Sequence, residues 1–174
     1  GSKWWKLFNS WAKGTNMTNR NPAPDTSGDF KTDLLKHVPR ARAFAHILCC
    51  YRHREADEIA LIAFKQAKAL RSQLIESGVN IEIWMLQTIL AEWRSCVLER
   101  RHVTSDNAFL DAFSLLPDGQ IEALAAVRGL DLDYKASAIL LGVARGTVKS
   151  RVNRANQALM DTLGDALIPE PLAA

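Results

Sequence analysis

The chain has 174 residues, of which 48% are apolar and 24% are charged, with 22 Lys and Arg against 19 Asp and Glu. This is the composition of a globular protein, and it excludes wholesale disorder. No apolar run approaches the roughly 18 residues that suggest a membrane span, so none is predicted. At roughly 100–200 residues per domain, the length fits one domain or two small ones. Gly1 and Ser2 are interpreted as residues left by expression.

The basic residues are distributed unevenly along the chain. Residues 104–174 contain six Lys and Arg against nine Asp and Glu, so this segment is acidic as a whole. Within it, however, four basic side chains fall in ten positions that contain no acid: Arg145, Lys149, Arg151 and Arg154. A focused positive stripe on an acidic module is typical of a nucleic-acid-binding surface.

The cysteines and histidines give no sign of a metal site or of catalysis. Cys49, Cys50 and Cys96 have neither zinc-site spacing nor a CxxC pair, so structural thiols in a reducing cytoplasm are predicted, with Cys49 and Cys50 packed in an apolar run. The histidines are scattered, and His46 on an apolar helix is interpreted as structural. Since no nucleophile–base pair or Gly-rich phosphate loop is present either, the prediction is a protein without catalytic residues, metal or cofactor.

The N-terminal part is predicted to contain a short helix and a linker. Within residues 3–13, aromatic side chains recur three to four positions apart between lysines: Trp4, Trp5, Phe8 and Trp11. This spacing predicts an amphipathic helix, which we expect to pack on the protein or a partner rather than to lie on a membrane. Residues 14–28 are rich in Gly, Pro, Asn and Thr and are predicted to form a linker, so 1–28 is treated as a separate segment.

Residues 29–103 are predicted to form a helical domain. Because proline suits the first turn of a helix, a new helix is expected to begin at Pro39. Apolar residues at helical spacing then predict helices over about 56–74 and 81–100. No period-two run or hairpin signal occurs, so no sheet is expected.

A second helical domain is predicted over residues 116–174, after a linker at 104–115 that has a possible short helix at 108–113. Its helices are expected at 118–128, 133–141 and 146–163. The predicted fold is therefore all-α, with two small helical domains joined by a linker and a short N-terminal amphipathic helix.

The stretch from Leu116 to Leu159 predicts a helix-turn-helix. Gly142 permits a tight turn, and Val148, Val152, Ala155 and Leu159 form the buried stripe of the helix that follows. In such a motif the second helix enters the major groove of DNA. The outward side chains of this helix suit phosphates and base edges, and they are the candidate DNA-binding residues: Arg145, Thr147, Lys149, Ser150, Arg151, Asn153 and Arg154.

This stretch closely resembles region 4 of bacterial sigma factors of the extracytoplasmic-function (ECF) class. The resemblance is carried by GTVKSRVNRA, preceded by LPDGQIEALAAV and DYKASAILLG. Upstream, LLKHVPRARAFAHILC followed by a short turn resembles region 2, most closely that of the EcfG-type group of the general stress response. The resemblance covers about residues 32–163, and it implies a region 2-like three-helix bundle and a region 4-like helix-turn-helix.

The resemblance implies a promoter-specificity subunit of RNA polymerase that is controlled by an anti-sigma factor. Promoter DNA, core RNA polymerase and an anti-sigma protein are the implied partners. The positions of the polymerase or anti-sigma contact correspond to Asp57, Glu58, Leu61 and Ile62. At Leu61 and Ile62 the sequence departs from the family, which usually has a polar Gln-Glu pair there.

Two alternatives remain open. A sigma-like mimic that sequesters an anti-sigma protein could lose its polymerase contacts, as Leu61, Ile62, Ala91 and Glu92 suggest, but it would have no use for the basic stripe. A helix-turn-helix repressor with a helical dimerisation or ligand domain would keep the DNA-binding face. An enzyme is the least expected class.

Overall fold

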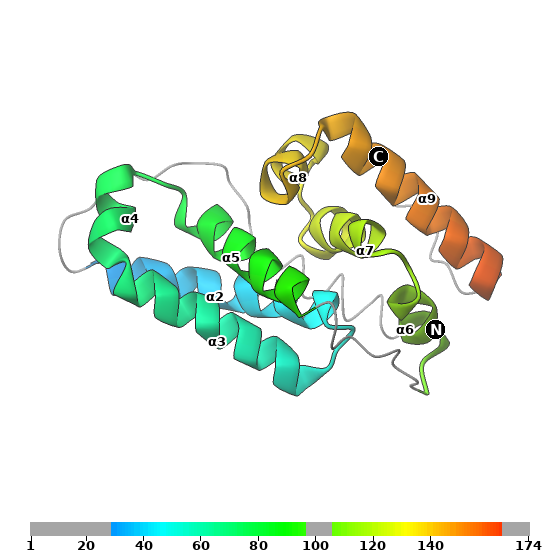
Figure 1. Cartoon of the computed structure of the whole chain (residues 1–174), viewed down its shortest axis with the longest axis horizontal. Coiled ribbons are helices and arrows are strands. Elements are labelled where there is room, and N and C mark those ends of the chain that lie inside the picture. The colour runs from blue at the N-terminus through cyan, green and yellow to red at the C-terminus, as the bar shows by residue number, and fades with distance from the viewer. Residues whose placement is uncertain (1–28, 97–105, 165–174) are drawn as a thin grey trace. The chain divides into compact units, whose positions relative to one another are not determined.

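The computed structural model describes residues 29–96 and 106–164, and every regular element in these ranges is helical (Figure 1). They form two compact units, one containing 29–96 and the other 106–164. This agrees with the predicted all-α fold of two helical domains. The predicted N-terminal helix at 3–13, the linker at 14–28 and the exact boundary near 103 lie outside the described residues.

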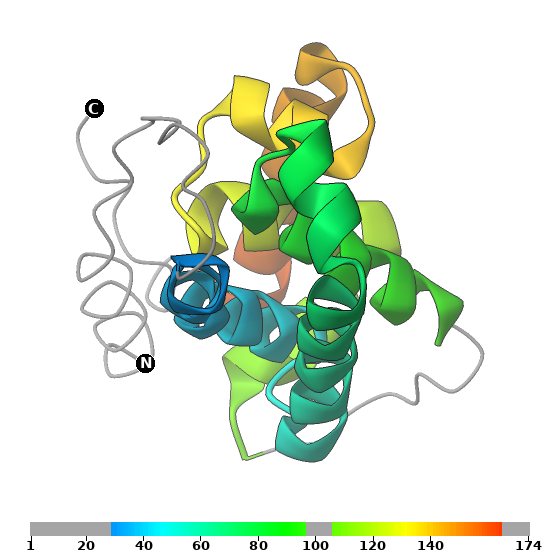
Figure 2. The same ribbon diagram turned by 90° about the vertical axis from the view of Figure 1, so that its left-hand side faces the viewer.

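The first unit is built from α2 (Asp29–Leu48), α3 (His53–Ala69), α4 (Arg71–Ser77) and α5 (Ile81–Ser95). Helices α2, α3 and α5 pack against one another as a three-helix bundle, and the short α4 connects α3 to α5 (Figures 1 and 2). The most deeply buried side chains of its core are at most 2% exposed, among them Leu34, Phe44, Leu86, Ile89 and Trp93. This burial supplies the main stabilisation of the bundle.

The helix start that the sequence predicted at Pro39 is wrong, because α2 runs through this residue without a break. Proline has no N–H to donate to the carbonyl of Leu35, four residues earlier. Pro39 is exposed and the side chain of Leu35 is 49% exposed, so water can reach this side of the helix. Burial of the opposite side, including Leu34 and Phe44, keeps the helix continuous.

The turn between α2 and α3 has an unusual backbone. Cys50 and Tyr51 follow one another with φ of 50° and 60°, in the left-handed region that non-glycine residues seldom adopt. Tyr51 N–H donates to the His46 carbonyl at 2.8 Å, and Arg52 N–H donates to the Cys49 carbonyl at 3.1 Å. These bonds hold a tight reversal, which lays α3 back along α2.

The second unit contains α6 (Ala108–Ser114), α7 (Asp118–Leu124), a π-helical turn η2 (Ala125–Gly129), α8 (Tyr134–Leu141) and α9 (Arg145–Leu163). Helices α6, α7 and α8 all contact α9, which is the longest helix of the unit. The short helix expected at 108–113 is present as α6, and it is part of the packed unit. No helix within the described ranges is long and apolar enough to cross a lipid bilayer.

Candidate nucleic-acid interface and partner-binding surface

Helices α8 and α9 form the predicted helix-turn-helix. The Asp133 carboxylate caps α8 by accepting a hydrogen bond from the Ala136 N–H at 2.6 Å. Gly142 ends α8 with a φ of 66°, a conformation that a residue with a Cβ adopts at a cost. The chain turns over three residues and enters α9 at Arg145. The turn that the sequence predicted at Gly142 is confirmed.

The buried side of α9 is also confirmed. Val148, Val152, Ala155 and Leu159 are between 0% and 6% exposed. In α8, Leu140 and Leu141 are buried, whereas Ile139 is 57% exposed. Helix α9 is thus anchored along one side by apolar packing.

The seven candidate DNA-binding residues all lie on α9, and the structure divides them by exposure. Arg145, Lys149, Asn153 and Arg154 are exposed. Thr147, Ser150 and Arg151 are half-buried. The first acid on the helix is Asp161, so the exposed stretch combines positive charge with hydrogen-bond donors. Such a surface can neutralise phosphates and present donors to the base edges of a major groove.

Arg151 differs from the other basic residues of α9. Its Nη1 lies 3.9 Å from Oε2 of Glu122 on α7, a carboxylate that is only 5% exposed. The exposed fraction of the Arg151 side chain is 32%. The structure therefore directs this guanidinium toward α7.

The second candidate site lies on α3, where Asp57 belongs to a network of side chains from α2 and α3. Asp57 accepts hydrogen bonds from Arg42 Nε at 2.7 Å and Arg42 Nη2 at 3.1 Å. His46 Nε2 lies 2.9 Å from Oδ1 of Asp57, and since an ionised carboxylate only accepts, this ring nitrogen is the donor. His46 Nδ1 lies 3.1 Å from Nδ1 of His53, so one of these two nitrogens donates to the other.

This network lowers the pKa of the Asp57 carboxyl well below its usual range, chiefly because Arg42 and then His46 donate hydrogen bonds to it. The same contact raises the pKa of Arg42. His46 is 9% exposed and bonded on both ring nitrogens, which confirms its interpretation as a structural histidine. Asp57 thus connects α3 to α2, while its side chain keeps 46% of its surface exposed.

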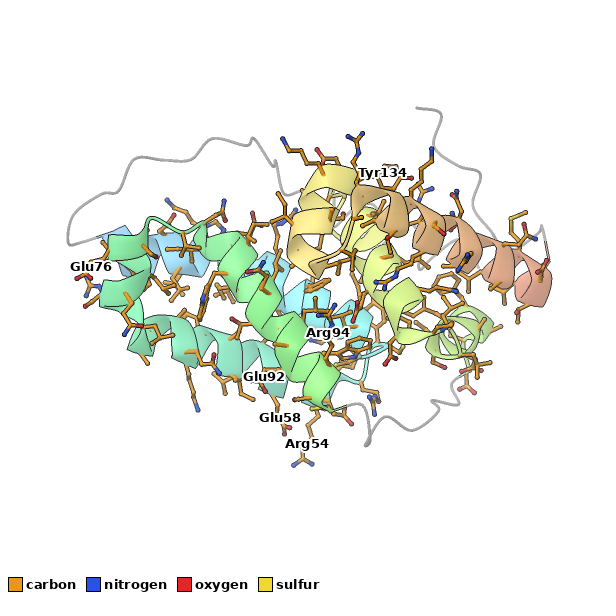
Figure 3. All side chains as sticks on the ribbon, turned by 45° about the horizontal axis from the view of Figure 1, so that its top comes forward. Arg54, Glu58, Glu76, Glu92, Arg94 and Tyr134 are labelled. Atoms are coloured by element: carbon orange, nitrogen blue, oxygen red, sulfur yellow. The ribbon has the colours of Figure 1, made fainter. Side chains whose placement is uncertain are left out.

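The other three candidate contact residues on α3 point outward. Glu58 pairs with Arg54 at 3.3 Å, and these side chains are 63% and 90% exposed (Figure 3). Leu61 and Ile62 are 50% and 37% exposed, next to the charged pair. Exposed aliphatic side chains beside charges form a surface suited to a protein partner rather than to solvent alone.

The Asp57 network predicts a pH-dependent stability. A carboxyl with a depressed pKa stabilises the fold above its unfolded pKa of about 3.9, and this contribution is lost as the pH falls through the folded value. We expect wild type to be more stable than Asp57→Asn in urea at neutral pH, with a difference that narrows steadily below about pH 4.

Urea midpoints measured between neutral and acidic pH check this expectation. Glu58→Gln is the matched control, because its partner Arg54 is 90% exposed and the pair contributes little at any pH. A constant difference between wild type and Asp57→Asn over the whole range would contradict the role assigned to the network.

One buried ion pair was missed by the sequence analysis. Arg40 Nε on α2 lies 2.6 Å from Glu82 Oε1 on α5, and the two side chains are 7% and 15% exposed. The two atoms are close but not aligned for a hydrogen bond with each other, so the contact is ionic. A signal was available, because Arg40 lies seven positions before the buried Ile47 and hence on the same side of the helix.

The thiols have the structural character that the sequence predicted for Cys49 and Cys50. Both are buried, and burial raises the pKa of Cys49 to about 12. A thiol with so high a pKa is a poor nucleophile. Among the described residues, no group of three or more His, Cys, Asp or Glu side chains is placed to hold a metal ion.

Comparison with known proteins places these features in a family, although no family model matches the chain. The chain is 30% identical, over an alignment of 151 residues that covers 75% of it and 82% of the relative, to the ECF RNA polymerase sigma factor EcfG of Rhodopseudomonas palustris (strain TIE-1). The chain belongs to the ECF sigma factor family. The family predicted from the sequence is thereby confirmed.

A solved structure agrees with this assignment. This ECF sigma factor resembles the sigma factor RpoE in its co-crystal structure with the anti-sigma factor NepR from Bartonella quintana, with a TM-score of 0.65 and 26% identity. The match covers 79% of this chain and 98% of that one. The two helical units are consistent with the fold of a sigma factor.

Proposed function

We propose that this ECF sigma factor directs core RNA polymerase to stress-type promoters in the cytoplasm and is controlled by an anti-sigma protein. Its role is binding rather than catalysis. The observation that carries the proposal is the exposed, acid-free basic stretch of α9, anchored by a buried apolar stripe in a helix-turn-helix. The related ECF sigma factor provides the family context.

In this proposal α9 enters the major groove of the upstream promoter element. Its N-terminal residues face the bases, as in other helix-turn-helix proteins. Arg145, Lys149 and Arg154 supply charge for phosphates or guanine edges, and Asn153 supplies the amide that suits adenine. Thr147 and Ser150, which are half-buried, contribute shorter hydroxyl contacts.

The outward surface of α3 is the proposed contact for a protein partner. Glu58, Leu61 and Ile62 are exposed together, whereas Asp57 is occupied with Arg42 and His46. Core polymerase and an anti-sigma protein are the two partners proposed for this surface. NepR in the co-crystal of the related sigma factor is an example of the second kind.

Transcription with purified core polymerase is the deciding test of the sigma function. Added to core enzyme, the full chain should start transcription from a template with a stress-type promoter, and core enzyme alone should not. Failure on every such promoter would reject the sigma function. If an anti-sigma protein were then recovered in a pull-down without polymerase, the exposed Leu61 and Ile62 would favour the sigma-like mimic.

A charge substitution on α9 gives a second prediction. Lys149→Ala should weaken binding to a labelled DNA duplex and make the slope of log K against log salt concentration shallower by about 0.9, the value for one lost phosphate contact. Lys65→Ala, which removes the same charge from an exposed site on α3, is the matched control and should leave the slope unchanged. If both variants changed the salt dependence of DNA binding equally, the binding would depend on the total charge of the protein and not on the position of Lys149.

A further inference from the structure

Arg151 has surroundings that set it apart from the exposed bases of α9. A Cβ placed on Gly119 of α7 would lie 2.9 Å from Arg151 Cζ, 3.1 Å from Nε and 3.2 Å from Nη1. The guanidinium therefore lies directly over the glycine, in space that any other residue at 119 would fill. Gly119 has no positive φ, so no backbone conformation demands a glycine at this position.

The neighbouring charge explains why the guanidinium lies there. Glu122 is 4% exposed and follows Gly119 on the same helix by three positions, hence on the same side of α7. Arg151 Nη1 approaches its Oε2 at 3.9 Å. A positive charge beside a buried carboxylate offsets part of the cost of its burial, so moving Arg151 away to a DNA phosphate would cost stability.

We propose that Arg151 is a positioning residue, which fixes α9 on α7 through Gly119 and Glu122 and makes no phosphate contact itself. The proposal rests on the proposed function, because α9 is taken as the helix that meets DNA. It assigns two tasks to neighbouring basic residues of α9. Exposed Arg154 meets DNA, and half-buried Arg151 holds the helix in place.

The first test uses the thermal unfolding midpoint (Tm) of the full chain, which needs no DNA. Ala for Gly at a helical site normally raises Tm, by about 2–8 °C for a unit of this size. Here Gly119→Ala should give no gain in wild type, because it displaces the guanidinium from Glu122. In an Arg151→Ala background the same substitution should show the normal gain.

Gly146→Ala is the matched control, because a Cβ there would meet no atom within 4 Å. It should raise Tm equally in both backgrounds. If Gly119→Ala also raised Tm equally in both, the guanidinium would be free to move away and the positioning role would be overturned.

The second test separates positioning from DNA contact. Arg151→Ala should lower Tm by at least about 4 °C and reduce affinity for a labelled mixed-sequence duplex by the same factor at every salt concentration. Arg154→Ala should leave Tm within about 3 °C of wild type but make the salt slope shallower by about 0.9. A shallower slope for Arg151→Ala with an unchanged Tm would overturn the proposal.

The outcomes also distinguish this proposal from the proposed function. If neither Arg154→Ala nor Lys149→Ala changed the salt slope, the DNA-binding role of α9 would fail. The two Tm comparisons would still decide whether Arg151 holds α9 on α7.

Discussion

Glu82→Ala should lower the free energy of unfolding by about 3–5 kcal/mol, the cost of removing one partner of a buried ion pair. The substitution leaves the Arg40 guanidinium, 7% exposed, without the carboxylate that lies 2.6 Å from its Nε. Glu82 also lies in the first turn of α5, where a negative charge interacts favourably with the helix dipole. The decrease in the free energy of unfolding can be measured by urea unfolding, monitored by far-UV circular dichroism.

Glu58→Ala is the control for this prediction. It also removes one glutamate from an Arg–Glu pair, but the Arg54–Glu58 pair is exposed and is worth about 0–1 kcal/mol. The double variant Arg40→Met with Glu82→Leu should recover most of the stability, since it removes both buried charges and keeps apolar volume. A loss below about 1 kcal/mol for Glu82→Ala would mean that solvent reaches Arg40.

Trp93→Ala should cost about 3–5 kcal/mol, the range for deleting a large aromatic side chain from a core. Trp93 is 1% exposed and is the largest of the fully buried side chains in the described residues. It lies on α5, which packs against both α2 and α3, so the cavity would open at the centre of the bundle.

Trp84→Ala provides the matched comparison on the same helix, because Trp84 is half-buried and its removal leaves a smaller cavity. It should shift the urea midpoint less than Trp93→Ala does. An equal loss for the two variants would contradict the central place assigned to Trp93.

The helix-turn-helix was predictable because its signals are local. Gly142 must allow the turn, and the four-residue spacing of Val148 and Val152 defines a buried stripe whatever packs against it. The exposed basic residues then follow from the same periodicity. The bundle was less predictable, because Pro39 is a good helix start locally and only burial on the opposite side of α2 keeps the helix running through it.

The positions of the candidate site residues could be predicted, but their partners could not. Asp57 was expected at a protein contact, yet it is hydrogen-bonded to Arg42 and His46, which lie fifteen and eleven residues earlier in the chain. Arg151 and Arg154 were both predicted from the sequence to bind DNA, although the two side chains have different surroundings on α9. Which side chains pair between two helices depends on which sides of the helices face each other. The spacing of residues along a single helix does not specify this.

Local sequence patterns were enough to predict the all-helical class, the division into two domains and the basic stripe of the second. These follow from apolar periodicity and charge, which act over a few residues. The packing of the helices, in contrast, sets which charged side chains pair within the chain: Arg40 with Glu82, Arg42 with Asp57, and Arg151 near Glu122. The energy of a charge depends on its burial and on the charges around it, and both are set only when the helices pack together.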